Sequence, residues 1–281
     1  MHKNKKPLMT IDTSFARAAQ LVLAQREETH IALIGCGGTG SWLAPAIVRI
    51  ARLMLDQNRK VSISFVDPDI VEDVNLYRQN FCQAELGRNK AEAVAVRYSA
   101  AWGVEIGFRA RRFDQKLDVH WHVTAILVGC VDNAPARKMM SDSLGRNNSH
   151  GEPPSVWWLD CGNSKEHGQV LLGSATKRAA LKAAFPSPKI CHALPSPALQ
   201  APGLLKAQPE ERKNGKKRMS CAELQAANAQ SLSINQRIAA EAADYLVRML
   251  IGPGLRKFAT DIDLVTGSAR SRAITPEEVN A

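Results

Sequence analysis

Glycines in a short turn are the first residues of this chain with the spacing for a chemical role. Gly35, Gly37 and Gly40 follow the pattern G-x-G-x-x-G, with Gly38 among them, between a strand-like apolar run and a helix-like one. Glycines let such a turn tighten and let its backbone approach a phosphate, and the N-terminus of the next helix favours negative charge. In this setting we favour nucleotide binding over a turn whose glycines serve packing alone.

Polar residues of the segment 65–81, and one just beyond it, could complete a nucleotide site. Asp67 ends the next predicted strand, where a carboxylate accepts hydrogen bonds from ribose hydroxyls. Further polar and charged side chains follow, namely Asp69, Asn75, Arg78, Gln79 and Lys90. If Arg78 or Lys90 is considered alone, an ordinary solvated surface charge is the better interpretation. Their spacing together favours contact with phosphates in the same crevice.

A third segment, GCVDNAPAR at 129–137, places another carboxylate at the end of a predicted strand. Asp132 could hold Mg²⁺ against triphosphate oxygens, a role in which carboxylates and waters are the usual ligands. The alternative is that Asp132 or Asn133 only caps the following helix. Two acids, two cations and a glycine turn on one edge favour a nucleoside triphosphate site for Asp132, while Asn133 fits the cap as well.

These residues need a scaffold that brings the ends of several strands together. Short apolar runs predict strands at 31–35, 61–67, 104–113, 125–132, 156–162 and 169–175. Helical periodicity predicts helices at 14–29, 40–55, 85–101, 134–145 and 221–250, with Pro45 in the first turn of the second. The alternation predicts a three-layer, Rossmann-like α/β fold with a mostly parallel sheet. Antiparallel strands are expected in its C-terminal half, at 169–175 and in a hairpin at 258–274.

The positive charge of the chain is concentrated in one segment. The formal net charge is +10, and residues 177–218 carry ten Lys or Arg and two Glu, which gives +8. We interpret 176–220 as a basic, proline-rich loop or insertion within a single domain spanning 1–281. Phe185 is its only Phe, Trp or Tyr, so the stacking residues of single-strand nucleic-acid binding are missing and a nucleic-acid partner is not expected.

Cysteine spacing and hydropathy exclude other classes. The six cysteines form no CxxC pair, so neither a zinc site nor a disulfide framework is expected. No apolar run is long enough for a membrane-spanning helix. The basic N-terminus has no apolar segment behind it, so we expect no signal peptide and a cytoplasmic location.

The ordered motifs carry a family resemblance. The set GxGGxG, DxDxVxxxNLxRQ, GxxKA and CxDN, within residues 31–175, resembles the ThiF/MoeB/HesA group and the enzymes that activate ubiquitin-like proteins. The SCAE at 220–223, the INQ at 234–236 and the C-terminal hairpin resemble the ThiF-related protein of plasmid PRTRC cassettes. The resemblance implies a homodimer that adenylates the C-terminal glycine of a small β-grasp protein, either ubiquitin-like or a sulfur carrier.

The resemblance also implies residue roles. Gly38 and its neighbours would cradle the phosphates of ATP, and Asp67 would bind the ribose. Asn75, Arg78 and Lys90 would contact the triphosphate, and Asp132 would hold Mg²⁺. The carboxylate of the partner protein would attack the α-phosphate and release pyrophosphate. A cation set of this kind can neutralise the charge of that reaction without a covalent protein group.

In a second step of the family, the acyl group moves to a cysteine of the enzyme. A conjugating-enzyme-like partner could then receive the acyl group. Cys221 is the best candidate, because it precedes a long predicted helix and follows a basic stretch that would favour its thiolate. The alternative is a thiol without a role, and Cys191 is the second choice. An N-terminal arginine that reaches the partner subunit is a further family feature, for which Arg17 or Arg26 is the candidate.

Two other functions stay open at this stage. One is a nucleotide-binding, non-catalytic adaptor of a plasmid cassette. The other is a nicotinamide-dependent oxidoreductase on the same fold. Arg78, Lys90 and Asp132 disfavour the oxidoreductase, because NAD has no triphosphate that would need two cations and a metal.

Overall fold

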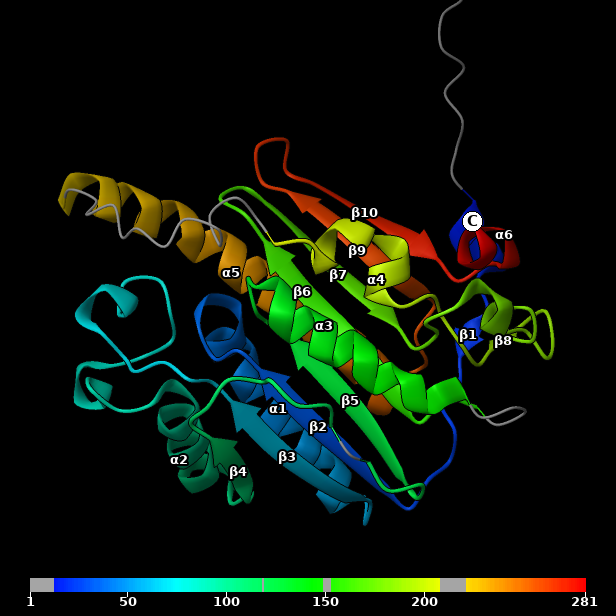
Figure 1. Cartoon of the computed structure of the whole chain (residues 1–281), viewed down its shortest axis with the longest axis horizontal. Coiled ribbons are helices and arrows are strands. Elements are labelled where there is room, and N and C mark those ends of the chain that lie inside the picture. Colours follow the sequence, from blue (N-terminus) through cyan, green and yellow to red (C-terminus); the bar gives the residue numbers. More distant parts are fainter. Residues whose placement is uncertain (1–12, 118, 149–152, 208–220) are drawn as a thin grey trace, which may run out of the picture.

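The structure is a computed structural model (Figure 1). It describes residues 13–117, 119–148, 153–207 and 221–281, and of residues 148 and 221–231 it describes the backbone alone.

An eight-stranded sheet forms the middle layer (Figure 1). Its strands are β2 (Glu28–Ile34), β3 (Lys60–Val66), β4 (Ile106–Arg109), β5 (Val123–Gly129), β6 (Val156–Asn163), β7 (His167–Gly173), β9 (Lys257–Asp263) and β10 (Ser268–Ala273). Their order is β10-β9-β7-β6-β5-β2-β3-β4. The five strands from β6 to β4 in that order run parallel, and β7, β9 and β10 pair antiparallel. The predicted sheet, including both antiparallel hairpins, is confirmed.

Helices cover both faces of this sheet. The α-helices are α1 (Gly38–Asp56), α2 (Lys90–Trp102), α3 (Ala134–Ser143), α4 (Pro197–Gln200), α5 (Cys221–Leu250) and α6 (Pro276–Asn280). Buried residues of α1, α2 and α5 form one apolar cluster with one face of the sheet, and those of α3 form a second cluster with the other face. Figure 1 shows α3 and α4 in front of the sheet and α1 and α5 behind it. The predicted three-layer arrangement is therefore confirmed.

The central strands are apolar on both sides because both of their faces are covered. In β2, Ile31 and Leu33 belong to the cluster with α1, while Ala32 and Ile34 belong to the cluster with α3. Every residue of β5 is buried. This double burial fixes the register, and with it the position of the carboxyl ends of the strands, where the candidate site residues lie.

The predicted helix at 14–29 is wrong. The segment holds a 3₁₀ turn, η1 (Ser14–Arg17), and a short strand, β1 (Gln20–Leu21), which pairs in parallel with β8 (Ile190–Cys191). The backbone N–H of Leu21 also donates to the carbonyl of Leu255 at 2.8 Å. Ala18 and Ala19 are buried in this arrangement, whereas Phe15 is 57% exposed. Pairing with these distant segments outweighs local helix propensity.

The helix predicted at 40–55 is present, but Pro45 lies in its interior and not in its first turn. Proline has no N–H, so the carbonyl of Ser41, four residues earlier, loses its helical partner. The side-chain amide of Asn80 donates to that carbonyl at 3.3 Å. A residue from the following crossover thus compensates for the proline.

Three other predicted bounds shift. The helix predicted at 85–101 begins at Lys90, because Asn89 caps it by accepting from the N–H of Glu92 at 3.1 Å. The strand predicted at 104–113 is limited to β4. The part of 176–220 that the structure describes contains three further short helices or turns beside β8, namely η5 (Arg178–Leu181), α4 and η6 (Pro202–Leu205). One domain with an insertion at 176–220 remains a proposal.

No helix among the described residues is both long and apolar enough to cross a membrane. A location in the cytoplasm remains a prediction.

Candidate functional site

The glycine turn is packed against the neighbouring strand end. Gly35 has a φ of +89°, and a Cβ placed there would lie 2.6 Å from the carbonyl oxygen of Cys130. A Cβ on Gly40 would lie 1.9 Å from the carbonyl oxygen of Gly35. Only glycine fits at these two positions, and the close fit brings the N-terminus of α1, at Gly38, to the carboxyl edge of the sheet.

A polar side chain from α5 covers Gly38. A Cβ on Gly38 would lie 2.7 Å from Oδ1 of Asn235. That Oδ1 accepts hydrogen bonds from Nδ2 of Asn163 at 2.6 Å and from Oγ1 of Thr39 at 3.3 Å. The network joins the end of β6, the start of α1 and the middle of α5, so it holds the turn against α5 and β6.

Asp67 holds the turn through hydrogen bonds to its carboxylate. Its Oδ2 accepts from the backbone N–H of Cys36 at 2.6 Å, and its Oδ1 accepts from the N–H of Asp69 at 2.8 Å. Burial raises the pKa of Asp67, while these two N–H groups and Lys90 oppose that rise. Each carboxylate oxygen has a second lone pair, so Asp67 can still accept from ribose hydroxyls.

Three more predicted residues lie on the same edge. Lys90 is buried, and its Nζ lies 3.5 Å from Oδ2 of Asp69. Within the described part of the chain, Nε of Arg78 and Oε1 of Gln79 are buried without a hydrogen-bond partner. A Cβ on Gly37 would lie 4.0 Å from that Oε1. Buried polar atoms are rarely left unpaired, so a polar ligand at the turn would satisfy them.

Asn75 and Asn133 have local structural partners. Oδ1 of Asn75 accepts from the N–H of Glu72 at 2.9 Å, in a capping box. Oδ1 of Asn133 accepts from the N–H of Ala136 at 3.0 Å, so Asn133 is the N-cap of α3. The side-chain oxygens of both residues are therefore engaged in caps, which leaves their amide nitrogens for a ligand.

Asp132 is exposed at the carboxyl end of β5. Its neighbour Val131 lies against Gly35, whose Cβ would be 3.0 Å from Cγ1 of Val131. In the ranges that the structure describes, Asp132 makes no hydrogen bond or ion pair. This lone carboxylate beside the glycine turn has the chemistry that Mg²⁺ requires. No group of three or more His, Cys, Asp or Glu among the described residues could hold a metal, so phosphates and waters would have to complete the ligand set.

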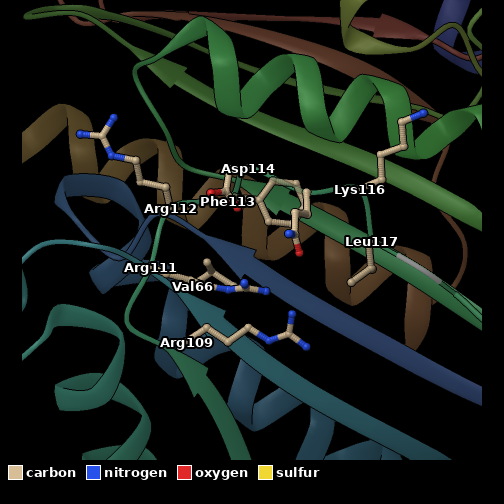
Figure 2. Close-up of a pocket in the computed structure, with 9 residues that line it drawn as sticks. Val66, Arg109, Arg111, Arg112, Phe113, Asp114, Lys116 and Leu117 are labelled. Atoms are coloured by element: carbon tan, nitrogen blue, oxygen red, sulfur yellow. The ribbon is translucent and has the colours of Figure 1, made fainter.

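A pocket of about 240 Å³ adjoins this edge (Figure 2). Val66, Phe113 and Leu117 supply its apolar surface, and Arg109 and Arg111, drawn below Phe113 in Figure 2, also line it. The backbone N–H of Asp67 donates to the carbonyl of Arg109 at 3.2 Å. The pocket therefore begins next to Asp67 and offers both apolar and cationic contacts.

A buried ion pair lies below the same edge. Nε of Arg137, on α3, donates to Oδ1 of Asp160, on β6, at 3.1 Å. Arg137 is 7% exposed and Asp160 is 0% exposed. Burial raises the pKa of Asp160 to about 6, although Arg137 opposes the rise.

Three of the described cysteines, Cys36, Cys161 and Cys191, are buried thiols with a raised pKa. Burial is the main cause that raises the pKa of Cys36 well above its ordinary value, with the nearby charge of Asp67 adding to it. A hydrogen bond with Cys130, followed by burial, raises the pKa of Cys161. Burial also raises the pKa of Cys191 to about 12, which disfavours it as a nucleophile. Cys36 and Cys161 are buried, which fits a role in packing.

Cys221 is distant from the turn in this structure. It is the first residue of α5, fourteen positions before Asn235. At 1.5 Å per residue, that separation is about 21 Å along the helix axis. The structure therefore brings Asp67, Asp69, Lys90, Gln79 and the glycines together and leaves Cys221 apart.

Arg17 and Arg26 lie outside this group. Arg17 ends η1, and Arg26 donates from Nη1 to the carbonyl oxygen of Trp121, just before the amino end of β5. Their role across a dimer remains a prediction.

Several residues of the site were not assigned a role from the sequence. Asn163 and Asn235 touch the glycine turn, and Arg137 and Asp160 lie below it. The INQ of 234–236 and the final arginine of GCVDNAPAR were weak signals for Asn235 and Arg137. Their partners are far away in sequence, so only the fold shows what they contact.

Comparison with known proteins decides the family. The sequence model of the ThiF family matches residues 12–278. The chain belongs to the ThiF family. No curated protein sequence matches the chain.

Solved structures share the fold of this ThiF-family chain. The microcin C7 biosynthetic enzyme MccB in complex with N-formylated MccA matches with a TM-score of 0.53 and 14% identity, over 88% of this chain and 64% of that one. The structure of E. coli MccB with AMPCPP and MccA matches with a TM-score of 0.52 and 15% identity, over 88% of this chain and 64% of that one. The structure of E. coli MccB with ATP matches with a TM-score of 0.50 and 13% identity, over 88% and 63%.

The chain thus spans less than two thirds of the length of these enzymes. At such low identity the likeness concerns the fold. The expected family is confirmed, and the particular likeness to the PRTRC protein remains a prediction.

Proposed function

We propose that this ThiF-family chain uses ATP to adenylate the C-terminal carboxylate of a peptide or small protein. The observation that carries the proposal is a pair of buried polar atoms, Nε of Arg78 and Oε1 of Gln79, which find no hydrogen-bond partner among the described residues. They lie on the edge that also holds Asp67 and Lys90, and a nucleotide bound there would supply their missing partners.

The base and the ribose fit the crevice around Asp67. The pocket of Figure 2 has apolar surface from Val66 and Phe113 for a base, and the guanidinium of Arg111 could stack on it. Asp67 is held by two backbone N–H groups with lone pairs to spare, and it would accept from the ribose hydroxyls.

The phosphates would lie over the N-terminus of α1. This helix begins at Gly38 without a side-chain cap, so its first N–H groups remain for an anion. Lys90 and Arg78 add two positive charges, and Asn75 contributes an amide nitrogen. Lys90 is held in place by burial and by Asp69, so its charge needs little rearrangement to act on the triphosphate.

Asp132 would hold Mg²⁺, with Asn133 adjacent as the helix cap. When bound, the ion would neutralise charge on the triphosphate oxygens. The exposed carboxylate of Asp132, which has no partner among the described residues, fits that role.

The reaction itself requires little covalent chemistry from the protein. A carboxylate oxygen of the substrate attacks the α-phosphorus, the bond between the α-phosphorus and its bridging oxygen to the β-phosphate breaks, and pyrophosphate leaves with the electron pair. The substrate carboxylate is already ionised at neutral pH, so no proton has to be removed. The chain's residues bind, orient and neutralise charge, which is the main contribution of proteins to such transfers.

The finer parts of the proposal rest on the family resemblance. We infer a substrate that is a small ubiquitin-like or sulfur-carrier protein ending in glycine, a homodimeric enzyme, and a thioester on Cys221 that a conjugating-enzyme-like partner could accept. MccB, whose structures contain ATP or the MccA peptide, supports ATP as the nucleotide and a peptide chain as the class of substrate.

Trapping of the acyl adenylate tests this function. The chain, Mg-ATP and a β-grasp protein ending in Gly-Gly are mixed with hydroxylamine, and mass spectrometry measures the hydroxamate formed at the C-terminus. The proposal predicts ATP-dependent hydroxamate that Asp132→Ala abolishes. Asp56→Asn, an exposed carboxylate at the other end of α1, should leave the yield unchanged.

ATP binding without hydroxamate from any carrier or peptide would favour the adaptor function. Binding of NAD with no binding of ATP would favour the oxidoreductase.

A further inference from the structure

The Arg137–Asp160 ion pair lies at the base of the turn that carries Asp132. The chain leaves the sheet at Gly129, passes through Asp132 and enters α3 at Ala134. Gly129 is the Cα partner of Asp160 in the β5–β6 ladder, and Arg137 binds the carboxylate of the same Asp160. Both ends of the segment 129–137 are therefore attached to one residue of β6.

Close packing restricts this segment further. A Cβ on Gly129 would lie 2.7 Å from Cε of Met140, so α3 lies directly on the sheet. A Cβ on Gly162 would lie 3.4 Å from Nη2 of Arg137. Together with the Asn133 cap, these contacts leave α3 one position relative to the ends of β5 and β6.

Stability alone does not explain this ion pair, because burying two charges costs desolvation free energy. Both partners are nearly or fully buried, and Oδ2 of Asp160 has no hydrogen-bond partner among the described residues. Replacing a buried ion pair by apolar residues is often neutral or stabilising, whereas polar pairs can select one arrangement over others. The arrangement selected here is that of the turn bearing Asp132.

The position of Asp132 depends on these contacts of the segment 129–137, because its own side chain is not held by any described residue. Its carboxylate makes no hydrogen bond or ion pair in the part of the chain that the structure describes. The position of its oxygens is therefore set by the backbone of 129–137. Side chains that do not touch a metal commonly tune its affinity in this way.

We propose that Arg137 and Asp160 are positioning residues that set the place of the Asp132 carboxylate and thereby the contribution of Mg²⁺ to ATP binding. The inference rests on the proposed function in assigning Mg-ATP to this edge. It adds that residues which contact neither nucleotide nor metal determine how strongly the metal is used.

Calorimetric titration with ATP, in Mg²⁺ and separately in EDTA, tests the proposal. The ratio of the two affinities measures the metal contribution. In Arg137→Met this ratio should fall by about tenfold, the lower range for loss of an outer-shell partner, while the affinity in EDTA stays unchanged. Asp132→Ala defines the limit at which Mg²⁺ has no effect.

A merely structural role gives a different pattern. It would lower the fraction of competent protein, or weaken both affinities equally, and leave the ratio unchanged; that result would overturn the proposal. Lys257→Met is the matched control, because it breaks a largely buried ion pair with Glu241 at 2.6 Å between β9 and α5, and its ratio should equal that of the wild type.

If Arg137→Met does not fold, Asp160→Asn decides the question. It keeps the size and a hydrogen-bond acceptor and removes the charge, and it should lower the ratio in the same direction; an unchanged ratio would refute the inference. A wild-type chain that binds no ATP in either buffer would refute the proposed function itself, which is a separate outcome.

Discussion

At the scale of single residues, hydrogen bonds with Asp67 and Asn235 hold the glycine turn in place. Asp67 and the glycines stand at spacings that a nucleotide requires, and the structure joins them through the N–H of Cys36. Asn235, in contrast, touches the turn from a position 196 residues away from Thr39. One amino-acid sequence does not indicate such a contact, because the contact arises from the packing of α5 on α1.

The Arg137–Asp160 pair makes stability depend on pH. The pKa of Asp160 rises from 3.8 to about 6 in the folded state, so the folded state holds the proton more tightly than the unfolded state. The contribution of this carboxyl to stability is therefore greatest below 3.8 and declines as the pH rises to about 6. Removing Arg137 should raise this pKa further.

Arg137→Met should consequently cost more stability at pH 8 than at pH 5. At pH 8 the ionised Asp160 would be buried without a partner, at a cost of about 3–5 kcal/mol. At pH 5 it would be largely protonated and the loss smaller. Urea denaturation at both pH values measures this difference. Arg248→Ala, which breaks an exposed pair with Asp244, should cost less than about 1 kcal/mol at either pH. Equal losses of stability for Arg137→Met at pH 5 and pH 8 would show that the charge of Asp160 is not the cause.

The fit between Gly38 and Asn235 gives a second prediction. Gly38→Ala would place a Cβ 2.7 Å from Asn235 and should cost about 1–3 kcal/mol. Asn235→Ala should relieve this clash, so the double variant should be more stable than the sum of the single losses predicts. Denaturant titration of the four proteins gives the coupling energy. Gly35→Ala is the contrast, since its clash with the carbonyl of Cys130 should persist when Asn235 is changed. Strict additivity for Gly38 and Asn235 would be the contrary result.

Helices and strands could be predicted where the hydrophobic periodicity is regular and glycine or proline marks the end of the segment. The bounds predicted for α5, 221–250, agree with the structure, because its helical stripe ends at Gly252-Pro253-Gly254. The prediction of a helix at 14–29 is wrong, because this segment pairs with β8 and Leu255. Those partners are distant in sequence, and local residue patterns do not indicate them. Pro45 lies in the interior of α1 and not in its first turn, because the helix begins at Gly38.

The position of Pro45 explains a role for Asn80. Asn80→Ala would leave the carbonyl of Ser41 without its donor and should cost about 1–2 kcal/mol. Pro45→Ala would restore a helical N–H for that carbonyl, so Asn80→Ala should cost about 1 kcal/mol less in the Pro45→Ala background. Thermal or denaturant unfolding of the double-mutant cycle measures the difference. The same cost in both backgrounds would show that Asn80 acts through its other bond, to Tyr98.

At the scale of the molecule, the three-layer fold places the candidate nucleotide residues on one edge of the sheet and Cys221 apart from them. The alternation of strands and helices was enough to predict this architecture, because parallel strands require helical crossovers. The distance of about 21 Å from Asn235 to Cys221 along α5 follows because α5 is one helix from Cys221 to Leu250.

This distance separates the two chemical steps of the proposal. Cys221→Ala should leave the adenylation rate within about twofold of the wild type, because the cysteine lies far from the charge that phosphoryl transfer must stabilise. It should remove a carrier adduct that thiols reverse, which non-reducing electrophoresis detects. Cys191→Ala is the control and should retain the adduct. Loss of adenylation in Cys221→Ala would mean that α5 needs this residue for its structure.

We propose that the glycine turn, Lys90, Arg78 and Asp132 activate a carboxylate with ATP. Exchange of labelled pyrophosphate into ATP measures the reversible step directly. We expect exchange that requires both Mg²⁺ and a carrier with a free C-terminal glycine, and that disappears in Asp132→Ala and Lys90→Ala. Exchange that continues without a carrier carboxylate, or none with any carrier while ATP still binds, would contradict this proposal.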